Sequence, residues 1–307
     1  MYENILVDGE WIDDDLARIR ADNVVPRNCT LRNGRRDALE VYGRNVRVEN
    51  RLIHHVLEGT RRAEHNEDAH GITGRPLNRT VRNTGISHVS GDALQFDPSR
   101  RAELRPWDNV LVEHCFLWTG PLDGGHALWK RGERRGENAF DNKTFTGEPR
   151  RSRITLRNSL FKGWGHGAIG NGVTLNLKEK VQAVVDTCVF VDNDIAFRCR
   201  GSPGSAWLTA RHCTVCRTSR VFRIEHHVQN LKIFHLAPGE GIGTKHDFVT
   251  EAGEGFEESG SRQAPGLARW PYTRLAVGVV IPPGEPPSSA DGAILTRLAT
   301  GWEGFPP

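Results

Sequence analysis

Four cations in the second half of the chain have a spacing that could bring them side by side. They are Lys143, Lys178, Arg198 and Arg200. Lys178 precedes the two arginines by 20 and 22 residues, which suits neighbouring turns of a coiled chain. A lysine can remove a proton when burial and nearby cations lower its pKa, and an arginine can bind a carboxylate through two bonds. Like charges one coil apart repel unless an anion lies between them, so the four cations predict a site for an acidic substrate.

Seven short segments with alternating apolar residues must position these cations. They cover residues 37–42, 68–73, 92–97, 138–143, 172–178, 195–200 and 220–225. Successive side chains of a strand point to opposite faces, so each segment offers two outward residues. Alignment on the apolar positions predicts one outward column of Glu40, Gly71, Gln95, Asp141, Asn176, Arg198 and Arg223, and a second of Tyr42, Thr73, Asp97, Lys143, Lys178, Arg200 and Glu225.

Another repeated pattern precedes these segments. It is an apolar alternation, then Asn or His, a small residue and one more apolar residue, and it occurs at 25–31, 46–53, 81–86, 110–117, 154–161, 183–190 and 208–215. The copies are 22, 33, 31, 44, 29 and 25 residues apart, which indicates a stacked solenoid with insertions. The period of two makes the units strands. We therefore expect an all-β solenoid of about seven or eight coils, whose strands pair in parallel roughly 4.8 Å apart.

Asparagine recurs at one position of this pattern, at Asn28, Asn50, Asn83 and Asn158. Asparagine tolerates left-handed backbone angles, and stacked amides can bond along a column. The column resembles the asparagine ladder of pectate lyase-like right-handed parallel β-helices, over about residues 20–236. The resemblance implies a right-handed parallel β-helix and an extracellular or periplasmic location. The first residues of the chain do not show the basic and apolar regions of a signal peptide.

The chain divides into three predicted parts. Residues 1–20 are expected to cap the first coil or to fray, 21–251 form the β-helix, and 252–307 are a Gly- and Pro-rich irregular tail. The net charge of +3 gives no field for nucleic acid. No apolar run reaches about 18 residues, so no membrane span is expected. The six cysteines are expected in the core rather than in disulfides, and we expect a monomer.

The segment from Asn176 to Lys178, followed by Phe197 to Gly201, resembles the lysine-then-arginine pairing of chondroitinase B-like and alginate lyase-like β-helix enzymes. In that resemblance Lys178 is the base of a β-elimination on a uronic-acid polymer, and Arg198 or Arg200 neutralises the carboxylate. The resemblance also implies Ca²⁺, for which the expected ligands are Asp97, Asp141 and Glu225. The residues expected to bind the acidic polysaccharide are Lys143, Gln95, Asn176, Arg223 and Trp129.

Two other functions stay open. A glycoside hydrolase needs two carboxylates about 5–9.5 Å apart, and the candidates on neighbouring coils are Asp68, Asp92, Asp97 and Asp141, with His166 in an order that looks faintly like polygalacturonases. A repeated turn-forming aspartate at positions 37, 68 and 92 is the competing interpretation of part of this set.

A carbohydrate-binding protein without catalysis is the third function. Sugar rings could stack on Trp107, Trp118, Trp129 and Trp164, although these side chains could also cover the core. Histidines gather near one insertion (His54, His55, His65, His70 and His88) and at His226 and His227. Their spacing matches no known metal motif, so we expect hydrogen-bonded histidines rather than ligands.

Overall fold

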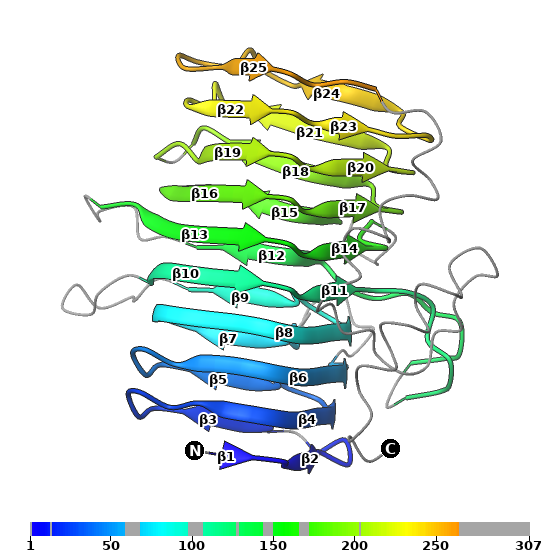
Figure 1. The fold of residues 1–307 in the computed structure, drawn as a ribbon. Helices are drawn as coiled ribbons and strands as arrows, with labels where there is room; N and C mark the ends of the chain where they lie inside the picture. Colours follow the sequence, from blue (N-terminus) through cyan, green and yellow to red (C-terminus); the bar gives the residue numbers. More distant parts are fainter. Residues whose placement is uncertain are drawn as a thin grey trace.

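The computed structural model of the 307-residue chain describes residues 2–12, 14–58, 68–97, 107–126, 129–143, 150–165, 172–202 and 204–263. Within these ranges the chain contains strands and turns and no helix. The strands stack coil upon coil, from the N-terminal strands at one end to β25 at the other (Figure 1). Each strand pairs in parallel with the corresponding strand of the next coil. The predicted all-β parallel β-helix is therefore confirmed.

One sheet contains nine strands of the described residues. In stacking order they are β3 (Ala17–Ile19), β5 (Leu39–Val41), β7 (Ile72–Gly74), β9 (Leu94–Phe96), β12 (Asn138–Asn142), β15 (Val173–Leu177), β18 (Ile195–Arg200), β21 (Arg220–Glu225) and β24 (Thr244–Phe248). We call it the site sheet, because it contains the outward columns that were predicted from the sequence.

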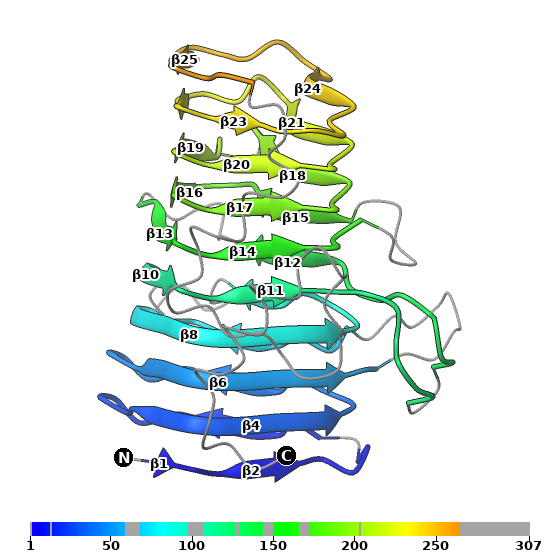
Figure 2. The same cartoon turned by 45° about the vertical axis from the view of Figure 1, so that its right-hand side comes forward.

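The other sheet has sixteen strands in the described part of the chain and folds into two runs. The first run consists of β1 (Tyr2–Glu3), β4 (Pro26–Gly34), β6 (Arg47–Val56), β8 (Leu77–Val89), β10 (Asp108–Glu113), β13 (Ser152–Arg157), β16 (Val181–Asp186), β19 (Trp207–Arg211), β22 (Leu231–Phe234) and β25 (Glu257–Ser259). The long strands β4, β6 and β8 continue into the second run, where they join β2 (Leu6–Asp8), β11 (Phe116–Trp118), β14 (Leu160–Lys162), β17 (Val189–Val191), β20 (Thr214–Cys216) and β23 (Ala237–Pro238). Figure 2 shows this second run stacked from β11 to β23.

Asparagine ladders hold two corners of the coils. In the predicted one, the Nδ2 atom of Asn50 donates to Asn28 and that of Asn83 donates to Asn50, each over 3.1 Å. A second ladder, which was not predicted, links Asn23, Asn45, Asn78 and Asn109 through side-chain bonds of 2.9, 3.1 and 2.8 Å. All of these residues have φ between 47° and 60°. The left-handed turn favours asparagine at these positions, although His114, Thr187 and His212 adopt the same backbone angle at the first of them in other coils.

The core lies inside the coils and is built from side chains stacked along the axis. Phe161, Phe190, Phe197 and Phe222 form a continuous file with ring centroids 4.6 to 5.0 Å apart. The six cysteines are all free and buried, as expected from their place in the repeat. Offset aromatic pairs add to the stabilisation from burial itself.

Regular pairing reaches both ends of the described chain. Strands β1 and β2 pair with β4, and β3 pairs with β5, so the described residues before position 20 contribute to the first coil. At the other end β25 pairs with β22. The predicted tail, 252–307, lies outside the described residues from position 264 onward. Nothing helical in the described ranges has the length and apolar character of a bilayer-crossing segment.

Candidate functional site

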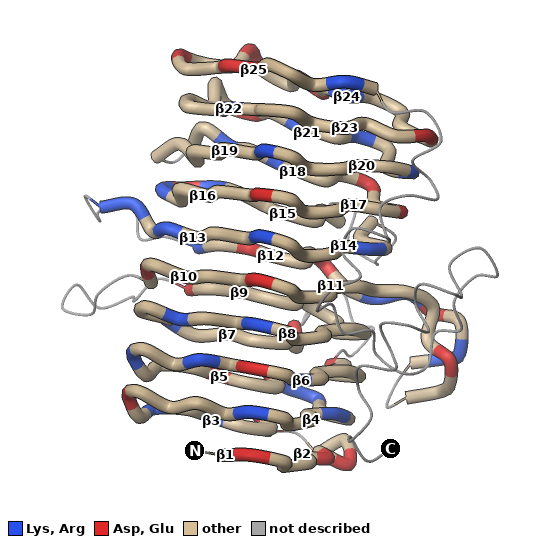
Figure 3. Tube along the Cα trace, in the orientation of Figure 1, with Lys and Arg blue, Asp and Glu red and all other residues tan. Residues whose placement is uncertain are grey.

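The site sheet places most of the predicted residues in two outward columns. Asp141 pairs with Gln95 on one side and with Asn176 on the other, and the column continues through Arg198 and Arg223. In the second column Arg200 pairs with Glu225, and Lys143 and Lys178 directly follow the ends of β12 and β15. Figure 3 shows acidic and basic positions distributed over successive coils rather than gathered at one end.

The alignment predicted for residues 68–73 was wrong by two positions. Glu40 pairs with Thr73, so Thr73 and not Gly71 belongs to the first column. His70 therefore occupies the position that was assigned to Asp68. The His70 amide donates to Asp37 Oδ1 over 3.0 Å, and the Asp92 amide donates to His70 Nδ1 over 2.8 Å. A histidine replaces aspartate in this column because its ring nitrogen can also accept a backbone hydrogen bond.

The predicted cations do lie on adjacent strands, but carboxylates accompany them. Lys178 Nζ lies 3.0 Å from Asp141. Arg198 makes two bonds to Glu225, of 3.2 and 3.0 Å. Arg200 is 3.5 Å from the same carboxylate. These pairs neutralise much of the positive charge that an elimination site would direct at its substrate.

Two further predicted binding residues lie in the same network. Lys143 Nζ donates to Gln95 Oε1 over 3.0 Å and lies 3.7 Å from Asp97. Arg223 donates to Glu225 over 2.7 Å and to Asp247 over 3.2 Å. Lys143 keeps 44% of its side chain exposed, so it remains available to a ligand.

The three expected calcium ligands are not brought together. Asp97 follows β9, Asp141 is in β12, and Glu225 is in β21. Strands β15 and β18 separate the last two, a distance of about 14 Å between backbones. Calcium needs its oxygen ligands at about 2.3–2.6 Å, so one ion cannot join all three.

The tryptophans are buried. Trp107, Trp118 and Trp164 are at most 1% exposed, and Trp129 is 5% exposed. Trp129 packs with Leu57 and Leu122, away from the site sheet, and the guanidinium of Arg135 covers its ring. Stacking of a sugar on Trp129 would require this cluster to open, so the structure supports the core role of these rings.

Carboxyl groups converge on the middle of the site sheet from consecutive coils. We call Asp68, Asp92, Glu137 and Asp141 the carboxyl cluster. Asp92 is fully buried and accepts bonds from the amide and side chain of Asn138, of 2.9 and 2.7 Å, and from Gln95 over 2.8 Å. Burial, together with the charge of Asp141, raises the pKa of Asp92 to about 8.

Glu137 is the member of the cluster that is partly exposed and also has a raised pKa. Burial raises its pKa to about 7, and the charges of Asp92, Asp68 and Asp141 add to the effect. Burial likewise raises the pKa of Asp141, although Lys178 opposes the shift. A carboxyl group that keeps its proton near neutral pH can act as a general acid.

Gly91 lies between Asp68 and Glu137 on the site sheet, at a closely packed position. The Glu137 amide donates to the Gly91 carbonyl over 2.9 Å. A Cβ atom at Gly91 would lie 2.8 Å from the Cβ of Asp68 and 2.6 Å from the His70 ring, so only glycine fits here. The backbones of Asp68 and Glu137 are two strand spacings apart, or about 9–10 Å.

A polar cleft of about 650 Å³ opens on the site sheet, and Asp68 of the carboxyl cluster lines it. Gln95, His70 and two arginines contribute to its wall, and the carboxylates that line it are Asp14, Asp15, Asp37, Glu40, Glu58, Asp68 and Asp97. Burial raises the pKa of Asp15, and the nearby charges of Glu40 and Asp37 raise it further. The cleft is therefore acidic, and it adjoins the basic part of the same sheet.

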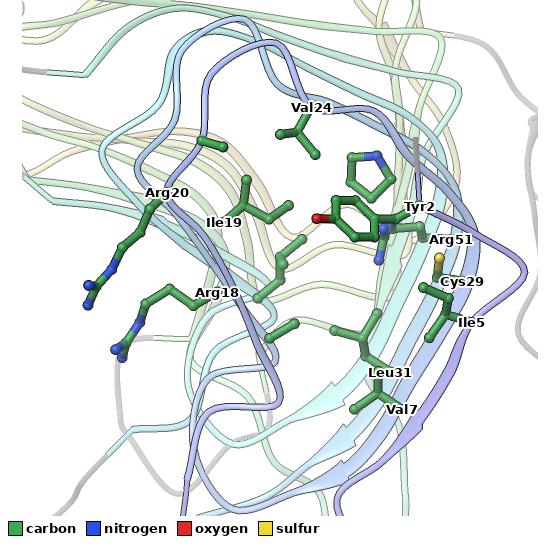
Figure 4. Close-up of a pocket in the computed structure, with 14 residues that line it drawn as sticks. Tyr2, Ile5, Val7, Arg18, Ile19, Arg20, Val24, Cys29, Leu31 and Arg51 are labelled. Atoms are coloured by element: carbon green, nitrogen blue, oxygen red, sulfur yellow. The ribbon is translucent and has the colours of Figure 1, made fainter.

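A separate hollow of about 320 Å³ lies at the N-terminal end of the stack (Figure 4). Apolar side chains such as Val7, Ile19 and Leu31 line it, and Arg51 points into it beside Tyr2. Arg51 is only 4% exposed, and its Nε atom has no hydrogen-bond partner among the described residues. Among the described residues that line the hollow, none is a carboxylate that would balance this charge.

Glu137 was missed from the sequence because the predicted strand begins one residue later, at Asn138. It ends the insertion Thr119–Glu137, whose path the repeat does not determine. His166, the other residue of the polygalacturonase-like order, lies outside the described residues. No protein-family model matches this chain, and a search of curated proteins finds no match.

Proposed function

We propose that this chain is a polysaccharide-cleaving enzyme of the pectate lyase-like β-helix type, and that it hydrolyses glycosidic bonds at the carboxyl cluster. The observation that supports the proposal is the convergence of Asp68, Asp92, Glu137 and Asp141, of which Asp68 lines the polar cleft. Burial and the mutual charges of these groups raise the pKa values of Asp92 and Glu137 to about 8 and about 7, so a carboxyl group that keeps its proton near neutral pH is available as an acid.

Glu137 and Asp68 suit the two roles of a hydrolase. Glu137 gives its proton to the oxygen of the leaving sugar, and Asp68 removes a proton from the water that attacks the sugar carbon. Water is consumed, the glycosidic bond breaks, and the two carboxyl groups exchange protonation states before solvent restores them. The backbones of the two residues are two strand spacings apart, and a hydrolase of this kind needs carboxyl groups about 6.5–9.5 Å apart so that water fits between acid and base. Asp92 is fully buried, so it positions Gln95 and Asn138 rather than contacting the substrate.

An acidic polymer fits the rest of the site sheet. Lys143, Arg200 and Arg223 are each about a third to a half exposed along the strands beyond the cluster. A chain of uronic acids laid across successive coils would meet these cations on one side of the cleavage point. Their partial neutralisation by Glu225 and Asp97 favours exchangeable binding over a permanent ion pair.

β-Elimination is the second candidate, and one observation favours it. Asn176 pairs with Arg198, which places Lys178 opposite Arg200 on the neighbouring strand. This is the arrangement that the resemblance to β-helix lyases implies. The pairing of Lys178 with Asp141 at 3.0 Å weighs against a free base, because the carboxylate already occupies the amino group.

The test is a digest of polygalacturonate, alginate and chondroitin, with neutral glucans alongside. Hydrolysis releases reducing ends without the ultraviolet absorbance of an unsaturated uronide, whereas elimination produces both. We expect Glu137→Gln to lower the rate at least ~100-fold, which is the usual contribution of a general acid. Glu49→Gln is the matched control, since Glu49 lies on the other sheet in an ion pair with Arg27.

The variants separate the candidates. If Lys178→Ala abolishes cleavage while Glu137→Gln retains the parental rate, elimination replaces hydrolysis. If every polymer is retained on the protein and none is cut, the chain is a binding protein and both mechanisms are excluded.

A further inference from the structure

We propose that His55, Asp123 and His126 form a binding site for one zinc-like divalent metal ion at the corner of the coils where β6 ends. We call it the histidine corner. The three side chains come from segments far apart in the sequence, and their ligand atoms all lie within 4.8 Å of one another. The proposal is independent of the proposed hydrolysis, since none of the three residues lines the polar cleft.

The insertion after β11 completes the corner. It projects from the side of the stack (Figure 2) and returns to place Asp123 and His126 against His55. The Asp123 carboxylate lies 3.1 Å from His126 Nε2 and 3.6 Å from His55 Nε2. Ligands bound to a tetrahedral metal at about 2.0–2.2 Å lie roughly 3.4 Å apart, so two of the three edges already have this length. The remaining pair of ligand atoms, on His55 and His126, is at most 4.8 Å apart, so these two atoms must approach by at most about 1.4 Å to reach the same length.

The residue types suit a metal ion. Imidazole nitrogens and a carboxylate oxygen are ligands that zinc takes from proteins.

The second layer holds the His55 ring in place. His88 stacks on it with centroids 4.8 Å apart, and Trp118 packs edge-on against His88 at 4.4 Å. His54 Nδ1 lies 2.6 Å from His55 Nδ1, so a hydrogen bond orients the nitrogen that does not face Asp123. Such outer contacts fix the tautomer and direction of a ligating histidine. Two imidazoles and one carboxylate suit zinc and related first-row ions rather than calcium.

The experiment is a titration of the tag-free, chelator-treated full chain with Zn²⁺ in competition with a chromophoric chelator. We expect one ion per chain, and we expect His126→Ala and Asp123→Asn each to weaken binding at least 10-fold. Both residues are on the insertion and at least partly exposed, so the stack should fold without them. Co²⁺ should give the visible absorption of a tetrahedral site in the parent and lose it in His126→Ala.

His212→Ala is the matched control. His212 lies 3.2 Å from Asp186 and stacks on His235, so it repeats the residue types on an exposed turn. Zn²⁺ affinity unchanged by His212→Ala and lost in the two corner variants supports the site. Absence of stoichiometric binding, or binding that survives both corner variants, overturns it. Glycan cleavage is measured separately with the Glu137 variant, so the two proposals fail independently.

Discussion

Some carboxyl groups have a higher pKa in the folded chain than in the unfolded chain, because folding buries them. Asp92 and Glu137 have pKa values raised from 3.8 and 4.5 to about 8 and about 7, mainly by burial. Between about pH 4 and pH 8 the folded state therefore holds protons that the unfolded state has released. The free energy of unfolding should fall as the pH rises through this window, by at most about 1.4 kcal/mol per pH unit for each group.

Urea unfolding at a series of pH values measures this slope. Asparagine at position 92 cannot ionise. We therefore expect the free energy of unfolding of Asp92→Asn to fall less steeply between pH 5 and pH 8 than that of the parent, so that the variant is relatively more stable at the alkaline end. Asp186→Asn serves as the comparison, because hydrogen bonds from His212 and Thr187 and the charge of Arg211 lower the pKa of Asp186 despite its partial burial. Identical slopes for the parent and Asp92→Asn would contradict the assigned proton.

Glu137 predicts a pH profile for activity as well. Its pKa of about 7 means that the protonated, active form is lost as the pH rises above neutrality. We expect the rate of hydrolysis to decline on this alkaline limb. Residual activity of Glu137→Gln should show no such limb, and reducing-end release between pH 5 and pH 9 measures both profiles.

Arg51 is a buried charge without a counter-charge in the described lining of its hollow. Burial lowers its pKa to about 10, which shows that the folded state disfavours the cation. We expect Arg51→Met to raise the free energy of unfolding by about 1–3 kcal/mol, since apolar replacement of buried charge is often stabilising. Arg27→Met, which breaks an exposed ion pair with Glu49, should lower it by less than about 1 kcal/mol. A loss of stability in Arg51→Met would show that an anionic group satisfies the guanidinium.

At the scale of elements, the asparagine ladder combines a backbone and a side-chain requirement. Asn50 has a φ of 52° and exchanges bonds with Asn28 and Asn83. We expect Asn50→Ala to cost about 3–4 kcal/mol, from roughly 1–2 for the left-handed backbone and about 1 for each of the two lost bonds. Asn50→Gly removes only the bonds and should be milder. Chemical denaturation of the two variants separates the contributions, and equal losses would refute this division.

The elements were more predictable than their exact register. The repeat identified the strands because periodicity of two survives in each coil, and Asn28, Asn50 and Asn83 marked one corner. The second ladder escaped notice because Asn23, Asn45 and Asn78 precede the repeated pattern rather than lie in it. Residues 68–73 were misaligned because Gly71 and Gly74 offer no apolar side chain to fix the alternation.

Sites built by insertions were the least predictable part. The cations of the two columns could be predicted, since their order follows the coils. Glu137, Asp123 and His126 could not, because they lie in or at the end of a segment whose course depends on tertiary contacts with β6 and β8. The acidic partners of the cations were also missed. Ion pairs such as Arg198 with Glu225 depend on side-chain contacts between neighbouring strands.

At the scale of the whole molecule, stability depends on contacts between neighbouring coils. The file from Phe161 to Phe222 connects five consecutive rings if His246 is included, since His246 stacks on Phe222 at 5.7 Å. We expect Phe197→Ala, in the middle of the file, to cost about 3–5 kcal/mol. Because each coil contacts only its neighbours, the loss should also separate unfolding into two transitions.

Circular dichroism and fluorescence through a urea gradient measure this effect. The control is Phe248→Ala, in the last strand of the site sheet, where the side chain is 44% exposed. It should shift the midpoint slightly and keep a single transition. A single transition in Phe197→Ala with parental cooperativity would contradict a stack that is coupled only through adjacent coils.

The described part of the insertion after β11 leaves the stack at a corner, and it contributes no residue to the asparagine ladders or to the stacked phenylalanine rings. Evolution could therefore vary the length and chemistry of this segment while the scaffold beneath it is inherited unchanged. The same independence makes the corner a place where a designer could transplant a foreign hairpin, with the histidines of β6 and β8 as a ready anchor.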